Sequence, residues 1–270
     1  MKRRTFLAAG TASLSAVAGC LSSGSGGEQT STPWSGYSEN KPSDGNTDGY
    51  PPKFDQQPKK RSIDTSLFKT VKEGGVQVPL APIDVVHYWY KRREARFADA
   101  RGPRSYKASH VLGAVLSPAP EKYRAPNDPV NEWPKDDRIV CYCGCPHHLS
   151  SIRASQLINA GYKNVYVIDE GFGAWMQRSY PMAGNDVQSQ SLPDAWVLRG
   201  KTAASYAGKN AWARHPDSEQ IESTNIADDG SYELHLKFYD VGPDSVVSVE
   251  TPEYTVEGTL SELSSGTITG

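Results

Sequence analysis

This chain of 270 residues has no excess of basic charge and no stripe rich in lysine and arginine. Lys and Arg total 29 against 31 for Asp and Glu, which gives a formal net charge of -2. Proteins that capture nucleic acid electrostatically need a basic stripe or patch. The composition therefore argues against nucleic acid as a partner, and the acidic balance fits a salty habitat.

Hydrophobic residues are also few, at 37% of the chain, so part of the sequence does not belong to a folded core. The weakly apolar run from Phe6 to Ala18 is too short to span a bilayer. Residues 21–60 are mostly Ser, Gly, Pro, Asn, Asp and Lys, with few aliphatic side chains. Such a composition cannot bury a core, so we expect a disordered tether over residues 21–60.

The first twenty residues, MKRRTFLAAGTASLSAVAGC, have the plan of an export signal. The pair Arg3-Arg4 before Thr, Phe and Leu resembles a twin-arginine signal. The ending VAGC resembles a lipobox, which implies cleavage before Cys20 and a lipid on its thiol. We expect a signal peptide at residues 1–20 and an archaeal surface lipoprotein, held by Cys20 on the outer face of the cytoplasmic membrane. The alternative is a hydrophobic first helix of the fold.

From residue 76 to residue 182, segments typical of strands and helices alternate. The expected strands are VQVPL, RFADAR, GAVLS, DRIVCYC and NVYVID, and the expected helices are APIDVVHYWYKRREA, SSIRASQLINAGY and GFGAWMQR. Ser150 or Ser151 fits the N-cap of the second helix, and Gly161 fits its end. This order predicts an α/β domain whose parallel sheet is covered by helices on both faces.

Residues 192–264 have a different pattern, without a long helical segment. SYELHLKF places Tyr232, Leu234, Leu236 and Phe238 on one face, and SVVSVETP and EYTVEGTL also alternate. We predict a small antiparallel β-sandwich here, an accessory module joined to the α/β domain by a hinge at residues 183–191.

Three of the four cysteines lie in the segment IVCYCGCPHHLSS, residues 139–151. Cys143 ends an expected strand, and a helix begins a few residues later. In open parallel sheets, sites form at this edge, where backbone N–H groups and a helix N-terminus favour an anion. A thiol in this position has a lowered pKa, so we predict that Cys143 is the catalytic nucleophile. The expected substrate-binding loop is Gly144, Cys145, Pro146, His147, His148, Leu149 and Ser150.

The neighbouring thiols leave several interpretations open. Cys145 fits a resolving thiol, a plain loop residue or half of a disulfide with Cys143. Cys141 lies two residues back in the strand and so points to the same side but deeper, which favours core packing. Zinc sites usually combine two separated ligand pairs, and the chain has no second cysteine pair. We therefore expect no metal at these residues and no other cofactor.

Three motifs follow one another in the order of a known family: FADARGPRSYKASHVLGAV, RIVCYCGCP and AGYKNVYVIDEGFGAW. With them, residues 76–182 resemble the rhodanese-like domain. The resemblance implies a sulfurtransferase that carries a persulfide on Cys143. Its donor would be thiosulfate or polysulfide, and its acceptor a thiol or cyanide. It also implies structural roles near the site for Asp99, Arg101 and His110.

One position departs from the family pattern. Many active members have an arginine five residues after the cysteine, where this chain has His148. The nearest downstream arginine is Arg153, so the Cys-x5-Arg cradle of phosphatases with this fold is also missing. The departure motivates a second hypothesis, a non-catalytic surface protein that uses the fold to bind a partner or metal. A third is a thiol–disulfide protein using Cys143 and Cys145.

Overall fold

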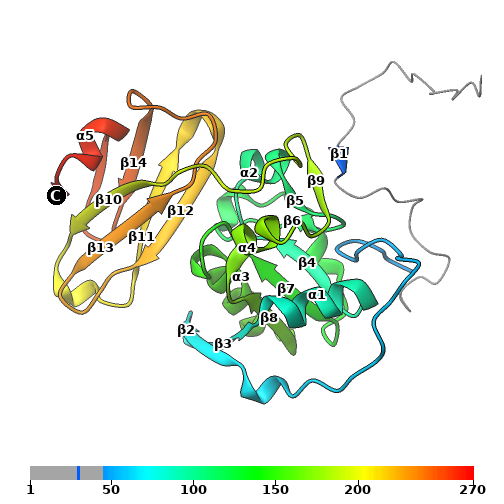
Figure 1. Cartoon of the computed structure of the whole chain (residues 1–270). Coiled ribbons are helices and arrows are strands. Elements are labelled where there is room, and N and C mark those ends of the chain that lie inside the picture. The colour runs from blue at the N-terminus through cyan, green and yellow to red at the C-terminus, as the bar shows by residue number, and fades with distance from the viewer. Residues whose placement is uncertain (1–28, 31–44) are drawn as a thin grey trace, which may run out of the picture.

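The computed structural model describes residues 29–30 and 45–270, which form two folded parts (Figure 1). The part that we call the α/β domain contains a six-stranded, mostly parallel sheet, and the part that we call the β-domain contains two further sheets. The predicted fold class is thereby confirmed. The expected signal peptide and Cys20 lie outside the described residues.

The central sheet has the strand order β2-β3-β8-β7-β4-β6, and every pair is parallel except β2 with β3. Its strands are β2 (Lys69–Glu73), β3 (Val76–Ala81), β4 (Arg96–Asp99), β6 (Val115–Leu116), β7 (Arg138–Tyr142) and β8 (Asn164–Ile168). Strand β2 was not expected. It forms a hairpin with β3 because Gly74 and Gly75 both adopt positive φ, as a tight two-residue turn requires.

Helices cover both faces of this sheet, as predicted. They are α1 (Ile83–Arg92), α2 (Pro103–Ala108), α3 (His148–Asn159) and α4 (Gly171–Gln177). Helices α1 and α4 share one core cluster with Phe97 and Val140, and α3 packs in another cluster with Ala98 and Cys141, their neighbours in the strands. Among the described residues, no helix has the length and apolar character needed to span a bilayer.

Helix α3 begins earlier than the sequence indicated. Its N-cap is His147, in the left-handed conformation, rather than Ser150 or Ser151. The Ser151 N–H already donates to the His147 carbonyl within the helix, and the Ser150 hydroxyl contacts the Cys143 thiol instead of capping the backbone. The expected end is correct, since Gly161 adopts positive φ just after the last turn.

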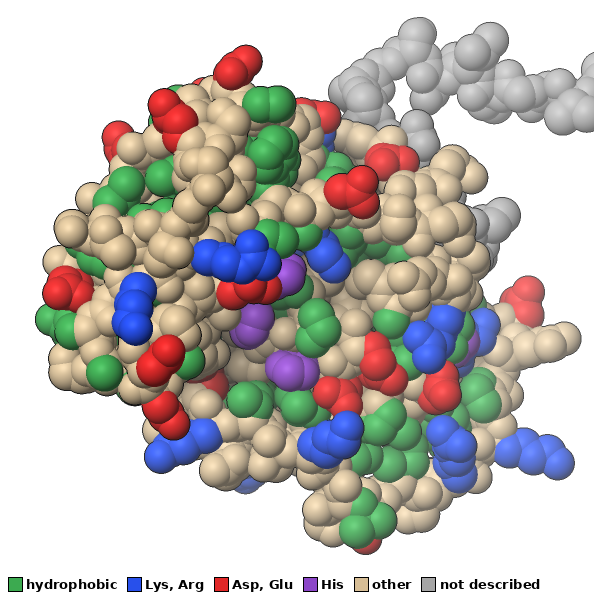
Figure 2. All heavy atoms as spheres, turned by 60° about the vertical axis from the view of Figure 1, so that its left-hand side comes forward, with side chains coloured by type: hydrophobic (Ala, Val, Ile, Leu, Met, Phe, Trp, Pro, Cys, Tyr) green, Lys and Arg blue, Asp and Glu red, His purple; other side chains and the backbone are tan. Residues whose placement is uncertain are grey.

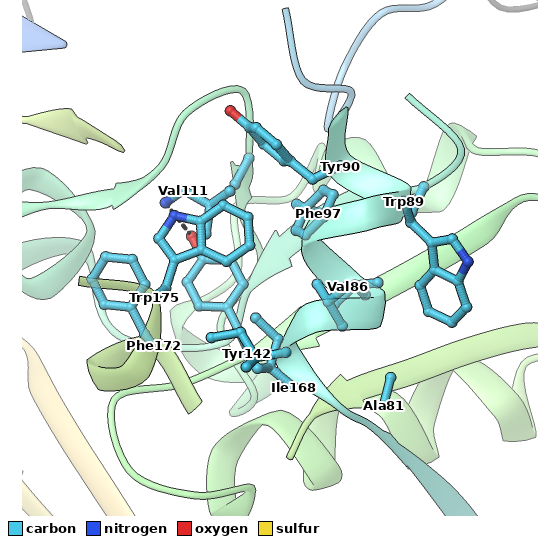
Figure 3. Packing of buried hydrophobic residues seen from close by; sticks show 14 of the residues in the cluster. Ala81, Val86, Trp89, Tyr90, Phe97, Val111, Tyr142, Ile168, Phe172 and Trp175 are labelled. Atoms are coloured by element: carbon cyan, nitrogen blue, oxygen red, sulfur yellow. Dashed lines mark hydrogen bonds between the residues drawn. The ribbon is translucent and has the colours of Figure 1, made fainter. Parts of the chain in front are cut away.

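Aromatic side chains fill the core between the sheet and helices α1 and α4 (Figure 3). The Tyr90 and Trp175 rings meet edge to face at 5.0 Å, and Phe97 lies 6.0 Å from Trp175. Tyr142 reaches this core, and its hydroxyl accepts a hydrogen bond from the Val111 N–H. Because side chains alternate along a strand, Tyr142 leaves Cys141 and Cys143 on the α3 face.

The segments flanking the α/β domain are more tightly packed than expected. A small sheet joins β1 (Gln29–Thr30), β9 (Met182–Gly184) and β5 (His110–Val111), and Val187 is buried in the core, so part of the segment predicted as a hinge, residues 183–191, packs with the α/β domain. In the region expected to be a tether, the Gly49 carbonyl accepts a hydrogen bond from the Phe97 N–H. Within the region expected to be a tether, residues 46–54 therefore contribute backbone contacts and buried surface to the α/β domain.

The β-domain packs two sheets, β13-β10-β16 and β12-β11-β14-β15, around its own core. As predicted, Tyr232, Leu234, Leu236 and Phe238 are buried together. The elements are β10 (Trp196–Lys201), β11 (Asn210–His215), β12 (Gln220–Asn225), β13 (Ser231–Leu236), β14 (Val246–Glu250), β15 (Thr255–Thr259), α5 (Leu260–Ser264) and β16 (Thr267–Ile268). Short 3-10 helices cover Thr65–Leu67, Glu121–Tyr123, Pro129–Glu132, Ala204–Tyr206 and Pro216–Ser218.

Candidate active site

Cys143 lies directly after β7, at the carboxyl edge of the parallel part of the sheet, with α3 beginning five residues later. Its Sγ donates to the Cys145 carbonyl at 3.0 Å and lies 3.3 Å from the Ser150 hydroxyl. The residue is fully buried. The predicted nucleophile therefore has the expected position in the fold, but it is closed off from solvent.

The surroundings of Cys143 favour its thiolate form. Burial by itself would raise the pKa of this thiol. Hydrogen bonds from Cys145 and from the side chain and backbone of Ser150, together with the charge of Arg101, outweigh burial and lower it to about 7. Cys141 differs, because burial dominates and raises its pKa to about 12. Of the two, only Cys143 has the electrostatics of a reactive thiol.

Arg101 supplies the positive charge near Cys143. Its guanidinium is buried and pairs in a bidentate manner with Asp99, at 2.9 Å for Nε and 2.6 Å for Nη2. The same guanidinium lies over the Phe172 ring, with its carbon 4.3 Å from the ring centroid. Its Nη1 atom is buried and has no hydrogen-bond partner among the described residues. Two residues predicted as structural thus position a cation beside the thiol.

Arg153, the nearest downstream arginine, forms its ion pair and hydrogen bond with residues other than the cysteines. It pairs with Asp128 at 3.0 Å and donates to the Ser117 hydroxyl at 2.7 Å, and all three residues are buried. His110 lies in β5, where its Nδ1 is 2.8 Å from the Tyr106 carbonyl oxygen. Its ring stacks on Tyr106 at 3.7 Å. Both residues therefore hold the scaffold.

The cysteine loop, residues 144–150, packs at its beginning against the first residues of α4. The Phe172 N–H donates to the Cys143 carbonyl at 2.9 Å, and Gly171 approaches the loop so closely that a Cβ there would lie 3.0 Å from the Cys145 carbonyl oxygen. Pro146 is exposed at the tip. The two histidines diverge, because His147 contacts Asp169 at 3.4 Å and His148 Nδ1 faces Cys145 Sγ at 3.6 Å.

Strand β12 of the β-domain covers this loop, a feature that sequence reasoning missed. Ile221 packs in one cluster with Cys143, Cys145 and Leu149. Next to it, the buried Glu222 carboxylate reaches Cys145 and His148, and the three ligand atoms lie within 4.8 Å of one another. Histidine side chains gather near the middle of the face shown in Figure 2. Residues 220–224 are all buried, which leaves no alternating pattern to mark an inward-facing acid.

These neighbours change one another's ionisation. A hydrogen bond with Cys143, then burial and the nearby Glu222, raise the pKa of the Cys145 thiol well above its ordinary value. Burial, followed by the Cys143 charge, raises the pKa of Glu222 to about 8. Burial also lowers the pKa of His148 to about 4, helped by the charges of His147 and His235. Cys145, His148 and Glu222 could together hold a metal ion.

Close contacts between the domains hold β12 in place. A Cβ added to Gly102 would lie 2.3 Å from the Glu219 carbonyl oxygen, so the backbones touch at this point. Arg104 pairs with Asp240 across the same boundary. The two domains therefore meet in a defined interface beside the cysteine loop.

Comparisons with known proteins find similarity in the part of the chain that includes Cys143. Residues 86–178 match the model of the family described as rhodanese-like domain. The BH2092 protein from Bacillus halodurans is 19% identical over 40% of this chain and 77% of its own, with a TM-score of 0.35. A thiosulfate sulfurtransferase from Pseudomonas aeruginosa is 22% identical over 38% of this chain and 19% of its own, with a TM-score of 0.32. A rhodanese-related protein from Thermoplasma volcanium is 14% identical over 38% and 95%, also with a TM-score of 0.32.

The matched segment begins in α1 and ends just after α4, so it includes Cys143 and the whole cysteine loop but none of the β-domain. Residues 86–178 of this chain are thus similar to the rhodanese-like domain.

Proposed function

We propose that the protein is an exported, lipid-anchored sulfurtransferase that moves sulfane sulfur through a persulfide on Cys143. The observation that carries the proposal is the position of this thiol, at the carboxyl end of β7 against the first turn of α3. There the Ser150 hydroxyl and backbone contact the sulfur and Arg101 lies nearby. Rhodanese-like domains generally use sulfur donors with thiol or cyanide acceptors.

The reaction would proceed in two displacement steps. The Cys143 thiolate attacks the outer sulfur of thiosulfate or a polysulfide, and a new S–S bond forms. The donor's own S–S bond breaks, so that sulfite or a shortened polysulfide leaves with the bonding pair. A thiolate or cyanide then attacks the outer sulfur of the persulfide, and Cys143 leaves as a thiolate. Each step conserves the number of electrons without another oxidant or reductant.

The groups that stabilise the anion would not include a residue at the loop position where many family members have an arginine. The N-terminus of α3 and the backbone N–H of Ser150 favour negative charge on the sulfur. The unpartnered Nη1 of Arg101 is suited to an anionic donor. Arg101 would thus replace the missing loop arginine, with His148 occupying that position without its charge.

Access is the main structural requirement of this proposal. Cys143 is fully buried, and Ile221 of β12 packs against the same cluster. A donor would reach the sulfur only after β12 separates from the cysteine loop. The same burial favours a second candidate function, a non-catalytic surface protein whose rhodanese-like domain binds a partner or metal.

Intact mass spectrometry separates the two candidates. After incubation with thiosulfate or polysulfide, the chain should gain the mass of one sulfur atom, and cyanide should remove it as thiocyanate. The adduct should be absent from Cys143→Ser and present in the matched control Cys145→Ser. A wild-type chain that gains no sulfur from any sulfane donor would support the binding function instead.

A further inference from the structure

The interface between β12 and the cysteine loop places three metal-ligand side chains together. They come from two domains, since Cys145 and His148 lie in the cysteine loop and Glu222 lies in β12. Figure 1 shows β12 on the side of the β-domain that faces the α/β domain. The rhodanese-like segment ends at residue 178, so this combination is not part of that domain.

The distances fit a tetrahedral metal. Zinc binds sulfur at about 2.3 Å and nitrogen at about 2.0–2.1 Å, so a tetrahedral angle separates two such ligand atoms by about 3.6 Å. The distance between Cys145 Sγ and His148 Nδ1 is 3.6 Å. A Glu222 carboxylate oxygen completes a group whose atoms all lie within 4.8 Å of one another. Little movement is needed to surround one ion.

Charge also favours a cation at this position. Glu222 is only 5% exposed, and within residues 45–270 no lysine or arginine forms an ion pair with it. Its carboxylate accepts a hydrogen bond from the Ser223 N–H, is hydrogen-bonded to the Cys145 side chain and is influenced by the charge of Lys237, which forms no ion pair with it. A buried carboxylate without a cation is costly, and a second acidic group beside it adds to this cost. A divalent ion would compensate for both.

We propose that Cys145, His148 and Glu222 form a metal site that holds the β-domain against the cysteine loop. One thiolate, one imidazole and one carboxylate are ligands that suit Zn²⁺, with a fourth position left for water or a small sulfur ligand. Cys143 is outside this group of three. The site therefore does not depend on the proposed sulfur transfer and could exist in a protein that catalyses nothing.

Metal analysis of the full chain tests the site directly. After equilibration with Zn²⁺ and removal of the excess, the wild-type protein should hold one ion per chain. Co²⁺ in its place should give the intense thiolate charge-transfer absorption of a tetrahedral site. The variants Cys145→Ser, His148→Gln and Glu222→Gln should each weaken binding by more than the ~10–100-fold that loss of an outer-shell partner costs.

Matched controls keep the test specific. His147→Gln changes the adjacent histidine, and Glu219→Gln changes an exposed glutamate just before β12; both should bind as the wild type does. Cys143→Ser should also keep the metal, although it loses any persulfide. This result would distinguish the metal site from the proposed function, whichever of the two fails.

Three results would overturn the proposal. The first is a wild-type chain that retains no Zn²⁺ and gives no thiolate band with Co²⁺. The second is a folded Glu222→Gln variant that binds Zn²⁺ as tightly as the wild type. The third is equal loss of metal from Cys143→Ser and Cys145→Ser, which would place the ion on the cysteines alone. If a variant fails to fold, X-ray absorption of the Co²⁺-loaded wild type still counts one sulfur ligand or contradicts it.

Discussion

At the scale of single residues, buried charge in the α/β domain is balanced by direct ion pairs. Arg101 pairs with Asp99, and Arg153 pairs with Asp128. Glu222 is the contrasting case, since it has no such partner among the described residues and faces a thiol and an imidazole. The ion-paired residues thus stabilise the fold, whereas the Glu222 carboxylate is left able to bind a proton or a cation.

Loss of one partner from a buried pair should be costly. Arg153→Met leaves Asp128 without its cation at 3% exposure, so the free energy of unfolding should fall by about 3–5 kcal/mol. Lys163→Met, which removes an exposed pair with Asp136, should change it by no more than about 1 kcal/mol. Urea unfolding measures both. Equal effects from the two variants would contradict the structural role of Arg153.

Residue-scale prediction from the sequence succeeded where the signal was local. The position of Cys143 could be predicted because an apolar strand leads into it just before a helix, and the structure places it there. Glu222 could not be named, because its role depends on packing between domains that are far apart in the sequence. The resemblance implied that Arg101 lies near the site, but the effect of its charge on the thiol was not predicted, since its spacing from Cys143 carries no periodic signal.

At the scale of elements, most strands and helices of the α/β domain followed from alternation and spacing. Strand β2 and helix α2 were missed because KTVKE and PRSYKA are short and largely polar. In the β-domain, β13 was clear from its buried alternate residues, whereas β12 is buried along nearly its whole length. Alternation thus identified β13 and failed for the strand between the two domains.

The contact between α1 and the segment after α4 should make stability depend on pH. His87 stacks on Tyr180 at 3.6 Å and meets Trp175 edge to face. Burial, with the Lys91 charge and against that of Asp84, lowers the pKa of His87 from 6.5 to about 4. The unfolded chain therefore binds this proton more readily, so stability is complete above pH 6.5 and falls as the pH drops towards 4.

The variant His87→Phe tests this dependence. It keeps an aromatic ring in the stack and removes the titrating group, so its stability should fall less than that of the wild type between pH 6.5 and 4. Thermal unfolding across this range measures the difference. Parallel curves for the two proteins would contradict a role for His87.

At the scale of the whole molecule, the β-domain acts as a cover over the reactive thiol. Its core is separate from that of the α/β domain, and β12 meets the cysteine loop through Ile221 and Glu222. Sulfur transfer would then require an open arrangement, and a metal held by both domains would favour the closed one. Chelation should therefore increase access to Cys143.

A side chain added at the domain interface should separate β12 from the cysteine loop without changing a residue of the site. Gly102 has an ordinary negative φ, so alanine costs little in conformation, but its Cβ would lie 2.3 Å from the Glu219 carbonyl oxygen. Each ~1.4 kcal/mol taken from the stability of the closed state raises the open population about tenfold.

Alkylation of Cys143 by iodoacetamide, in the presence of a chelator, should accelerate accordingly in Gly102→Ala. Gly242→Ala, which meets nothing within 4 Å, should leave the rate unchanged. Equal rates in all three proteins would mean that β12 does not limit access.

The persulfide on Cys143 is the central claim, and intact mass spectrometry of the full chain tests it most directly. With a chelator and excess thiosulfate or polysulfide, the account predicts one added sulfur on the wild type, faster addition on Gly102→Ala and none on Cys143→Ser. Cyanide should then return each protein to its original mass. If neither the wild type nor the opened Gly102→Ala variant takes up sulfur from any of these donors, the sulfurtransferase account is wrong.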